Sequence, residues 1–192
     1  MYSHWEPDRG NRRKALLDML RGAVQKGTFQ LASGVVSNFY VDARSVLLTP
    51  EGSFLAAYEF IELLAERGIT AVGGPAIGAC PIVSTIGAVA YMRGQMLKLF
   101  YVRSMEKEHG LKRTIEGPAL VKEDRVLLVE DVVTTGASIL NALSEVQKTG
   151  ATVTSVVALV DRGDNKKDLP VPLSSIFHIG EILPNSNEGV GK

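Results

Sequence analysis

The sequence of 192 residues has a single cysteine, Cys80, a single tryptophan and no excess of charge of either sign. One thiol cannot form a disulfide within the chain, which is typical of proteins in a reducing compartment, so we expect a cytoplasmic location. Its 21 basic residues balance 21 acidic ones. Net charge therefore gives no reason to expect nucleic acid or a membrane surface as the main partner.

A long uninterrupted apolar run is also lacking. The most apolar stretch, residues 71–92, has about the length of a membrane span but contains four glycines and two prolines. That composition favours a buried strand, a turn and a helix over a transmembrane helix. The first 14 residues are polar and carry no apolar segment typical of a secretory signal. We therefore expect no membrane partner.

An apolar content of 45% over this length is enough for one domain with a sizeable core. Apolar spacing predicts helices at 12–26, 50–67, 80–93 and 137–148, and strands at 69–73, 98–102, 125–129, 152–160 and 175–179. Two short extended runs, 28–31 and 39–42, predict a hairpin around Ser33-Gly34. Because strands alternate with helices, the fold class is α/β, with a central, mainly parallel sheet flanked by helices.

In such folds ligands bind beyond the carboxyl ends of the strands. Four loops should meet there: 74–79, 104–117, 130–136 and 161–165. The first contains three glycines counted from Gly73, so its backbone N–H groups could contact an anion, or it is a tight turn chosen for packing. The second is long and charged, which is typical either of a lid or of a solvated surface loop.

Residues 126–138 are the most informative segment. An aliphatic strand ends at Glu130 and Asp131, and Thr134-Thr135-Gly136-Ala137-Ser138 then leads into a helix. N–H groups and hydroxyls at a helix N-terminus bind anions, and the two acids suit sugar hydroxyls or a divalent cation. The alternative is a helix capped by Thr or Ser beside two exposed acids. The segment matches neither a Walker loop nor a dinucleotide fingerprint.

An aliphatic strand, two acids and a Thr- and Gly-rich loop resemble the signature of the type I phosphoribosyltransferases. Three further segments resemble the orotate-using branch of that family: 31–34 with 39–42, 101–110 and 115–117. The resemblance covers roughly residues 27–163. It implies transfer of phosphoribose from 5-phosphoribosyl-1-pyrophosphate (PRPP) to orotate, giving orotidine 5′-monophosphate and pyrophosphate in pyrimidine biosynthesis. Mg²⁺ would be the cofactor, held mainly through PRPP, with no metal site built from protein residues alone.

The resemblance also implies a domain plan and a set of site residues. One domain, 1–192, would carry a small N-terminal hood subdomain formed by residues 1–45 and the C-terminal segment, and residues 104–117 would be a flexible catalytic lid loop. Catalytic roles fall on Asp131, Lys107, His109 and Arg103. PRPP would be bound by Arg103, Lys107, His109, Glu130, Asp131, Val132, Val133, Thr134, Thr135, Gly136, Ala137 and Ser138, and orotate by Thr134, Arg162, Phe39 and Tyr40.

Two positions depart from the family. Ala32 stands where the family commonly has a Lys that contacts orotate, and Ser104 stands where it usually has a Lys on the pyrophosphate side, so the base is in more doubt than PRPP. At Gly78 some members carry a Lys and others, like this chain, are Gly-rich. Arg162 could instead be a surface residue paired with a neighbouring Asp, and Phe39 and Tyr40 could be strand core.

The partners implied by the resemblance are PRPP, orotate and a second copy of the chain, with lid residues shared across a homodimer interface. Two alternatives stay open. The enzyme could act on another base, or the fold could serve as a PRPP-sensing regulator that binds nucleic acid, although the length leaves no room for an additional DNA-binding domain and the net charge is zero.

Overall fold

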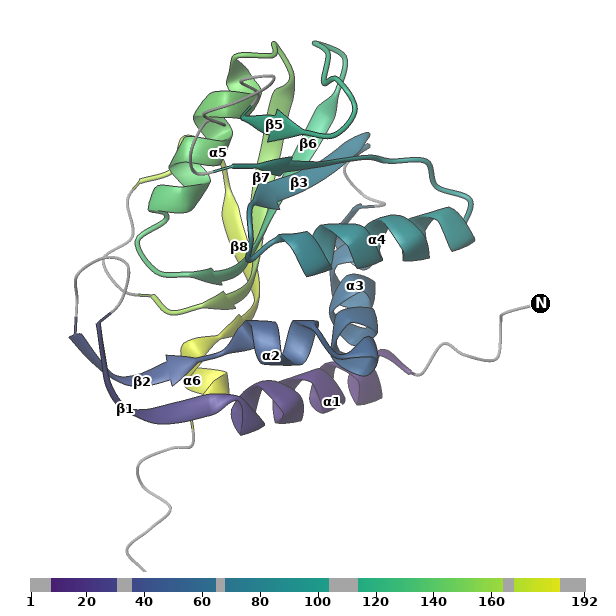
Figure 1. Ribbon diagram of the computed structural model, residues 1–192. Coiled ribbons are helices and arrows are strands. Elements are labelled where there is room, and N and C mark those ends of the chain that lie inside the picture. Colours follow the sequence, from purple (N-terminus) through teal and green to yellow (C-terminus); the bar gives the residue numbers. More distant parts are fainter. Residues whose placement is uncertain (1–7, 31–35, 65–67, 104–113, 164–167, 184–192) are drawn as a thin grey trace, which may run out of the picture.

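The computed structural model describes residues 8–30, 36–64, 68–103, 114–163 and 168–183. Its centre is a sheet with the strand order β5-β4-β3-β6-β7-β8 (Figure 1). All neighbouring strands in it are parallel except the pair β4 and β5. The strands are β3 (Ala71–Pro75), β4 (Lys98–Val102), β5 (Ile115–Glu116), β6 (Arg125–Val133), β7 (Thr152–Asp161) and β8 (Leu173–His178). The predicted α/β class with a mainly parallel sheet is confirmed.

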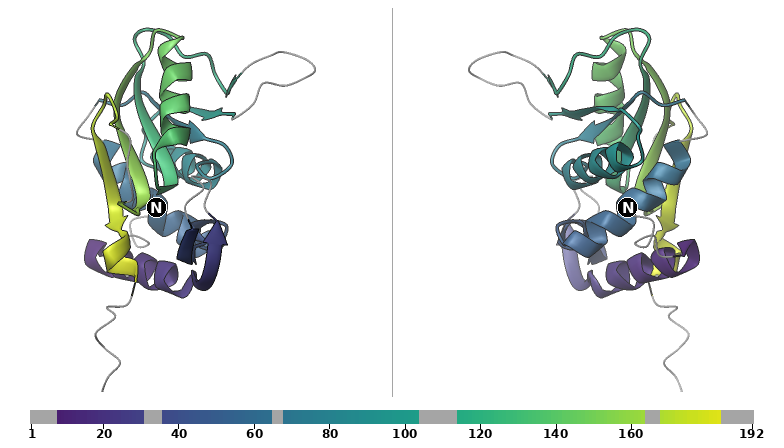
Figure 2. Two further views of the ribbon diagram at one scale, coloured as in Figure 1. Left: turned by 90° about the vertical axis from the view of Figure 1, so that its left-hand side faces the viewer. Right: turned by 90° about the vertical axis from the view of Figure 1, so that its right-hand side faces the viewer.

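Helices cover both faces of this sheet (Figure 2). On one face lie α3 (Pro50–Leu64) and α4 (Cys80–Met92), and on the other lies α5 (Ala137–Gln147). Alternate residues of β6 divide between the two cores: Leu127 packs with α3 and α4, whereas Leu128 packs with α5. Burial on both faces explains why this strand is an unbroken aliphatic run in the sequence.

The first four elements of the described chain precede the sheet, and we use the name hood for them here, while the predicted division into a hood subdomain stays a prediction. The hood consists of α1 (Arg9–Gly22), the antiparallel hairpin β1 (Val24–Gln30) and β2 (Val36–Val41), and α2 (Ala43–Leu47). The C-terminal helix α6 (Ile179–Ile182) lies beside α1 (Figure 1), and the guanidinium of Arg21 donates to the carbonyl of Glu181 at 2.9 Å. Here the two ends of the described chain meet.

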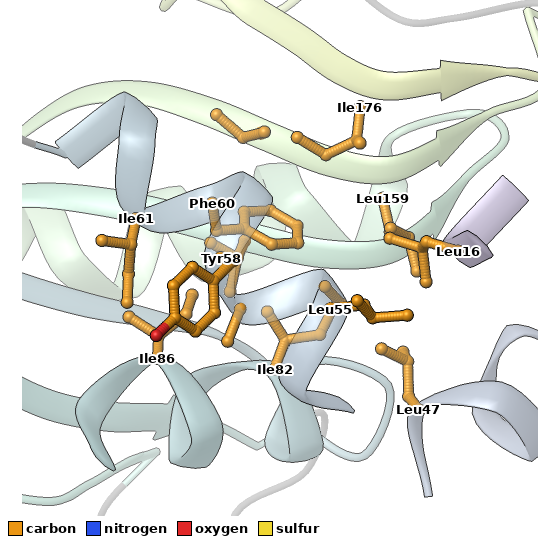
Figure 3. Packing of buried hydrophobic residues seen from close by; sticks show 14 of the residues in the cluster. Leu16, Leu47, Leu55, Tyr58, Phe60, Ile61, Ile82, Ile86, Leu159 and Ile176 are labelled. Atoms are coloured by element: carbon orange, nitrogen blue, oxygen red, sulfur yellow. The ribbon is translucent and has the colours of Figure 1, made fainter. Parts of the chain in front are cut away.

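The hood and the sheet share one apolar core (Figure 3). Leu16 of α1 and Leu47 of α2 belong to the same buried cluster as Leu55 of α3 and Leu159 of β7. Burial of apolar side chains across the boundary is the main force that fixes the hood relative to the sheet. The two parts are therefore held in place relative to each other, and each supplies one wall of the cavity described below.

Two helix starts follow from capping residues. The carboxylate of Asp8 accepts from the N–H of Gly10 at 3.0 Å and begins α1. Thr49 caps the helix that begins at Pro50, because its hydroxyl accepts from the N–H of Gly52 at 3.0 Å. Pro50 occupies the first turn, where the missing N–H costs nothing.

The prediction for the N-terminal helix, 12–26, was wrong at its end. Helix α1 ends at Gly22, and Val24 begins β1 because it pairs with Val41 of β2. Pairing in the hairpin thus overrides the helical spacing of the apolar residues. The turn predicted at Ser33-Gly34 lies outside the described residues.

Two strands also differ from the prediction. Strand β6 does not end at Val129 but runs to Val133, because its last residues pair with β7, Val133 lying opposite Asp161. In the predicted lid, Ile115–Glu116 form β5, which pairs with Tyr101 and Val102 of β4. A strand of two residues is too short to leave a periodic signal in the sequence. Residues 104–113 lie outside the described chain, and the lid stays a prediction.

The apolar stretch 71–92 is divided between β3 and α4, as predicted. Among the described residues no helix combines the length and apolar character needed to cross a bilayer.

The strand order reverses between β3 and β6. From β3 the chain proceeds to β4 on one side, and β6 leads to β7 and β8 on the other. A parallel sheet opens a crevice at the carboxyl ends of the strands where its order reverses, and ligands bind in such crevices. The carboxyl ends of β3 and β6 should therefore flank the functional site.

Candidate active site

A cavity of about 860 Å³ lies at this reversal point, between the carboxyl ends of the strands and the hood. Its volume is in the range of small-molecule sites. The hood side is lined by Gln30, Tyr40, Val41 and Arg44. The sheet side is lined by Pro75, Ala76, Ile77, Gly78, Arg103, Glu130, Asp131, Val132, Thr134, Ser138 and Arg162.

The segment after β6 presents the N-terminus of α5 to the cavity. Gly136 is the N-cap residue and has φ +75°, a left-handed conformation that glycine adopts without strain. In the described structure no side chain caps this helix. The interpretation of Thr134–Ser138 as a conventional cap is therefore wrong, and the first N–H groups of α5 are left for an anion.

Glu130 is buried, with 5% of its surface exposed. The hydroxyl of Ser138 donates to its carboxylate at 2.9 Å, which ties the end of β6 to the first turn of α5. Burial, and then the adjacent charge of Asp131, raise the pKa of Glu130 well above its ordinary value. Glu130 thus connects the end of β6 to the start of α5 at the wall of the cavity.

Asp131 has a different environment from its neighbour. Its carboxylate accepts from the N–H of Val132 at 2.8 Å and lines the cavity. Opposite it lies Gly78 in the loop after β3, where an added Cβ would overlap the Asp131 carboxylate. The two loops thus approach so closely that residue 78 has no room for a side chain.

The loop after β3 is fixed where it leaves the strand. The N–H of Ala76 donates to the carbonyl of Val102 at 2.8 Å. At Gly74 an added Cβ would overlap the carbonyl of Val129. The peptide bond between Ala76 and Ile77 is cis. The interpretation of the glycines as a requirement of close packing is correct at Gly74, while Ala76, Ile77 and Gly78 also line the cavity.

Arg162 at the end of β7 is buried, with 5% of its surface exposed. Its guanidinium donates to the hydroxyl of Ser37 at 3.0 Å and lies 4.5 Å from the centre of the Phe39 ring. Both contacts come from β2, so the hood orients an arginine of the sheet. The alternative interpretation of Arg162 as a surface residue is wrong. An oriented, buried guanidinium facing a cavity is suited to bind a carboxylate through two hydrogen bonds.

Arg103 follows β4 and also lines the cavity. Its backbone N–H donates to the carbonyl of Thr114 at 2.8 Å, and its guanidinium lies 3.5 Å from the carboxylate of Glu116. Both ends of the segment that contains the predicted lid are thus close together. Lys107 and His109 lie outside the described residues, so their predicted roles stay predictions.

The structure brings most of the other predicted site residues together. Glu130, Asp131, Val132, Thr134, Ser138, Arg162 and Tyr40 line one cavity. Val133 is buried in β6, and Thr135, Gly136 and Ala137 form the turn into α5. Phe39 is not among the residues that line the cavity, and its ring lies against the guanidinium of Arg162. Its predicted contact with the base stays a prediction.

Two polar residues of the hood that line the cavity were not predicted as site residues, Gln30 and Arg44. Arg44 follows the recognised segment 39–42 by two residues, and the only signal was a basic residue just after a capping Asp. Gln30 carries no distinguishing pattern in the sequence.

The donor set suits a divalent cation held chiefly by a substrate. Within the described ranges, no three His, Cys, Asp or Glu side chains gather as a metal site. Asp131, the less buried of the two carboxylates that line the cavity, is the kind of protein ligand that a hydrated cation takes together with substrate phosphates.

Comparison with known proteins agrees with the class of protein that the fold and the cavity indicate. Residues 55–184 match the phosphoribosyl transferase domain family, the class that this sheet and its anion loop define. The orotate phosphoribosyltransferase of Aquifex aeolicus (strain VF5) is 40% identical over 159 residues, covering 81% of this chain and 86% of that protein. The orotate phosphoribosyltransferase of Streptomyces avermitilis is 41% identical over 151 residues, covering 78% and 82%.

Comparison with solved structures leads to the same family. The crystal structure of Mycobacterium tuberculosis H37Rv orotate phosphoribosyltransferase in complex with PRPP has a TM-score of 0.71 and 28% identity, covering 89% of this chain and 98% of that chain. The chain belongs to the orotate phosphoribosyltransferase family.

Proposed function

We propose that the cavity between hood and sheet transfers phosphoribose from PRPP to N1 of orotate, giving orotidine 5′-monophosphate and pyrophosphate. The observation that carries this proposal is the pairing of two subsites in one cavity. The start of α5 and Asp131 form a site for a sugar phosphate, and the oriented Arg162 forms a site for a carboxylate. Orotate is a base that carries a carboxylate, so both substrates have a complementary group here.

In this proposal the 5′-phosphate of the ribose binds the segment Thr134–Ser138, through the first N–H groups of α5 and the hydroxyl of Thr134. Asp131 holds the ribose hydroxyls next to the bond that breaks. As pyrophosphate leaves, positive charge develops on the sugar, and the carboxylate of Asp131 stabilises it. Arg103, with Lys107 and His109 from the lid, would bind the departing pyrophosphate, and a closed lid would exclude water.

Mg²⁺ fits this arrangement as a cofactor held mainly by PRPP, with Asp131 as the protein carboxylate within its reach. Bound there, it would neutralise part of the negative charge of the pyrophosphate.

The experiment that tests the substrate is a base screen. Purified protein is mixed with PRPP, Mg²⁺ and one base at a time, and product is followed by chromatography or, for orotate, by loss of its absorbance. We expect turnover with orotate and none with adenine, hypoxanthine or uracil. Turnover with another base but not with orotate would overturn the assignment of the base, because the sequence lacks the Lys at Ala32 that relatives carry.

The carboxylate clamp is tested separately with Arg162→Lys, which keeps the positive charge but loses the planar pair of donors. We expect the KM for orotate to rise by roughly tenfold or more, because charge-assisted hydrogen bonds contribute about 1.5–3 kcal/mol. The KM for PRPP should change little. An equal loss for both substrates would indicate a general disturbance of the cavity instead.

The homodimer with shared lid residues is part of the same proposal and is supported by the resemblance of residues 101–110 to the family. Lys107→Ala and Asp131→Asn should each be nearly inactive. If a lid serves the partner's cavity, mixing the two variants restores part of the activity, because mixed dimers hold one complete site. Light scattering should show a dimer. A monomer, or mixtures that stay inactive, would refute sharing.

A further inference from the structure

Three described arginines line the cavity: Arg44, Arg103 and Arg162. The proposed function gives Arg162 the base and Arg103 the pyrophosphate. Arg44, from α2 of the hood, has no role in it. Its side chain is 51% exposed and lies at the cavity wall.

The backbone that carries Arg44 is firmly placed. The carboxylate of Asp42 caps α2 by accepting from the N–H of Ser45, and the hydroxyl of Ser45 donates to the carbonyl of Asp42 at 2.7 Å. Val46 and Leu47 of the same helix are buried in the core shared with the sheet. A short helix anchored on one side thus presents Arg44 on the other.

The guanidinium itself is oriented by one hydrogen bond. It donates to the hydroxyl of Tyr40 at 3.2 Å, and the Tyr40 ring packs 5.7 Å from that of Phe29. Its other near neighbour is Asp42, whose carboxylate lies 3.9 Å from Nε of Arg44. Most of its donors therefore remain accessible for an anion in the cavity.

Arg44 also shares a neighbour with the loop after β3. Its pKa is raised by Tyr40 first, and also by the carboxylates of Asp42 and Asp131. The same Asp131 carboxylate occupies the space that a side chain at Gly78 would need. Arg44, Gly78 and Asp131 line the same cavity, so Arg44 belongs to the cavity in which the proposed mechanism places the ribose carbon.

The distribution of positive charge in the site also supports a role for Arg44. Ser104 is uncharged at a place on the pyrophosphate side where the resembling family usually carries a lysine, and Gly78 is uncharged where some members carry one. Pyrophosphate is a polyanion and needs cations as it departs. On the basis of the proposed function, we infer that Arg44 binds the pyrophosphate group of PRPP and stabilises its departure, a contribution from the hood that replaces a lysine missing elsewhere.

The test compares two ligands that differ only in the pyrophosphate. Binding of PRPP and of ribose 5-phosphate, each with Mg²⁺, is measured by calorimetry for the wild type, Arg44→Ala and Arg44→Lys. We expect Arg44→Ala to weaken PRPP binding about tenfold or more and to leave ribose 5-phosphate binding within about threefold, since only PRPP carries the contacted group. Arg44→Lys should recover part of the PRPP affinity. Arg21→Ala, an exposed hood arginine outside the cavity with 50% side-chain exposure, is the matched control and should bind both ligands as the wild type does.

Steady-state kinetics complete the test. Inhibition by added pyrophosphate should weaken in Arg44→Ala, while the KM for orotate stays within about threefold of the wild type. A selective rise in the KM for orotate would place Arg44 at the base and overturn the inference, as would unchanged PRPP binding. A wild type that binds PRPP but does not use orotate would refute the assigned base alone. A wild type that does not bind PRPP would refute both proposals.

Discussion

At the scale of single residues, the site separates two neighbouring carboxylates into different roles. Both carboxylates line the cavity, but Glu130 is buried and accepts from the hydroxyl of Ser138, whereas Asp131 is half-buried and accepts from the N–H of Val132. We therefore expect Glu130 chiefly to hold the loop and Asp131 chiefly to meet the substrate.

This difference predicts the effect of removing each charge. Asp131→Asn should lower kcat by roughly 10²–10³-fold, because the carboxylate that faces the developing positive charge is lost while the shape is kept. The measurement is the initial rate with PRPP, Mg²⁺ and orotate at saturation. Glu130→Gln is the matched control and should cost much less, since an amide oxygen can still accept from Ser138. Similar losses for both variants, or unchanged kinetics for Asp131→Asn, would contradict the assignment.

The sequence could not predict which single residues are buried or how their side chains are oriented. The sequence indicated Arg162 only by its place after a strand and by a family resemblance. That it is buried depends on Ser37 and Phe39, more than 120 residues earlier, which contact it only after the hood has folded over the sheet. Arg44 was missed for the same reason, because its place at the cavity is set by tertiary packing of α2.

At the scale of elements, long periodic segments were predictable and short ones were not. The bounds of β4 were predicted correctly, and those of α5 and β7 to within one residue. Helix α2 and strand β5 have five and two residues, respectively, too few to show a period. The end of β6 was misplaced because its last residues follow the pairing with β7 rather than apolar content.

The contact between the loops after β3 and β6 gives a prediction at this scale. Gly78→Ala should lower kcat/KM for PRPP by about 10²-fold, because the new Cβ would displace the Asp131 carboxylate and small misplacements of a reacting group are costly. The melting temperature should change little, since the loop lies at the cavity. In Gly22→Ala an added Cβ meets no atom within 4 Å, so this control should keep full activity. Unchanged kinetics in Gly78→Ala would show that the two loops are farther apart than described.

At the scale of the whole molecule, the cavity lies between the hood and the sheet, and its shape depends on how these two parts are packed together. We call the contact of α1 and α2 with α3 and the sheet the joint. Besides the shared apolar core, charged residues link α1 to α3. Glu62 lies 2.9 Å from the guanidinium of Arg9 and also pairs with Arg12. One turn away on α3, Glu59 is buried, with its carboxylate 4.0 Å from Arg13. These two glutamates share a helix but differ in how well their charges are compensated.

That difference predicts a pH-dependent stability of the joint. The pKa of Glu59 is raised, chiefly by burial and then by the charge of Glu62. The folded protein therefore holds the Glu59 proton more tightly than the unfolded chain does. The contribution of Glu59 to the free energy of unfolding is therefore greatest below the ordinary carboxyl pKa, and it falls as the pH rises through the raised pKa. Above that range, ionised Glu59 leaves a carboxylate in the interior at a net cost.

Replacing Glu59 by Gln removes this cost and leaves the size of the side chain unchanged. At pH 8 we expect Glu59→Gln to raise the melting temperature by roughly 2–4 °C, which corresponds to about 1 kcal/mol in a protein of this size. The gain should disappear at acid pH, where Glu59 is itself neutral. Glu62→Gln, the matched control on the same helix, should lower the melting temperature at pH 8, because it removes the carboxylate that Arg9 and Arg12 contact. Calorimetry across the pH range decides the matter: a lower melting temperature for Glu59→Gln at pH 8 would mean that attraction to Arg13 outweighs burial, and that Glu59 stabilises the joint by its charge.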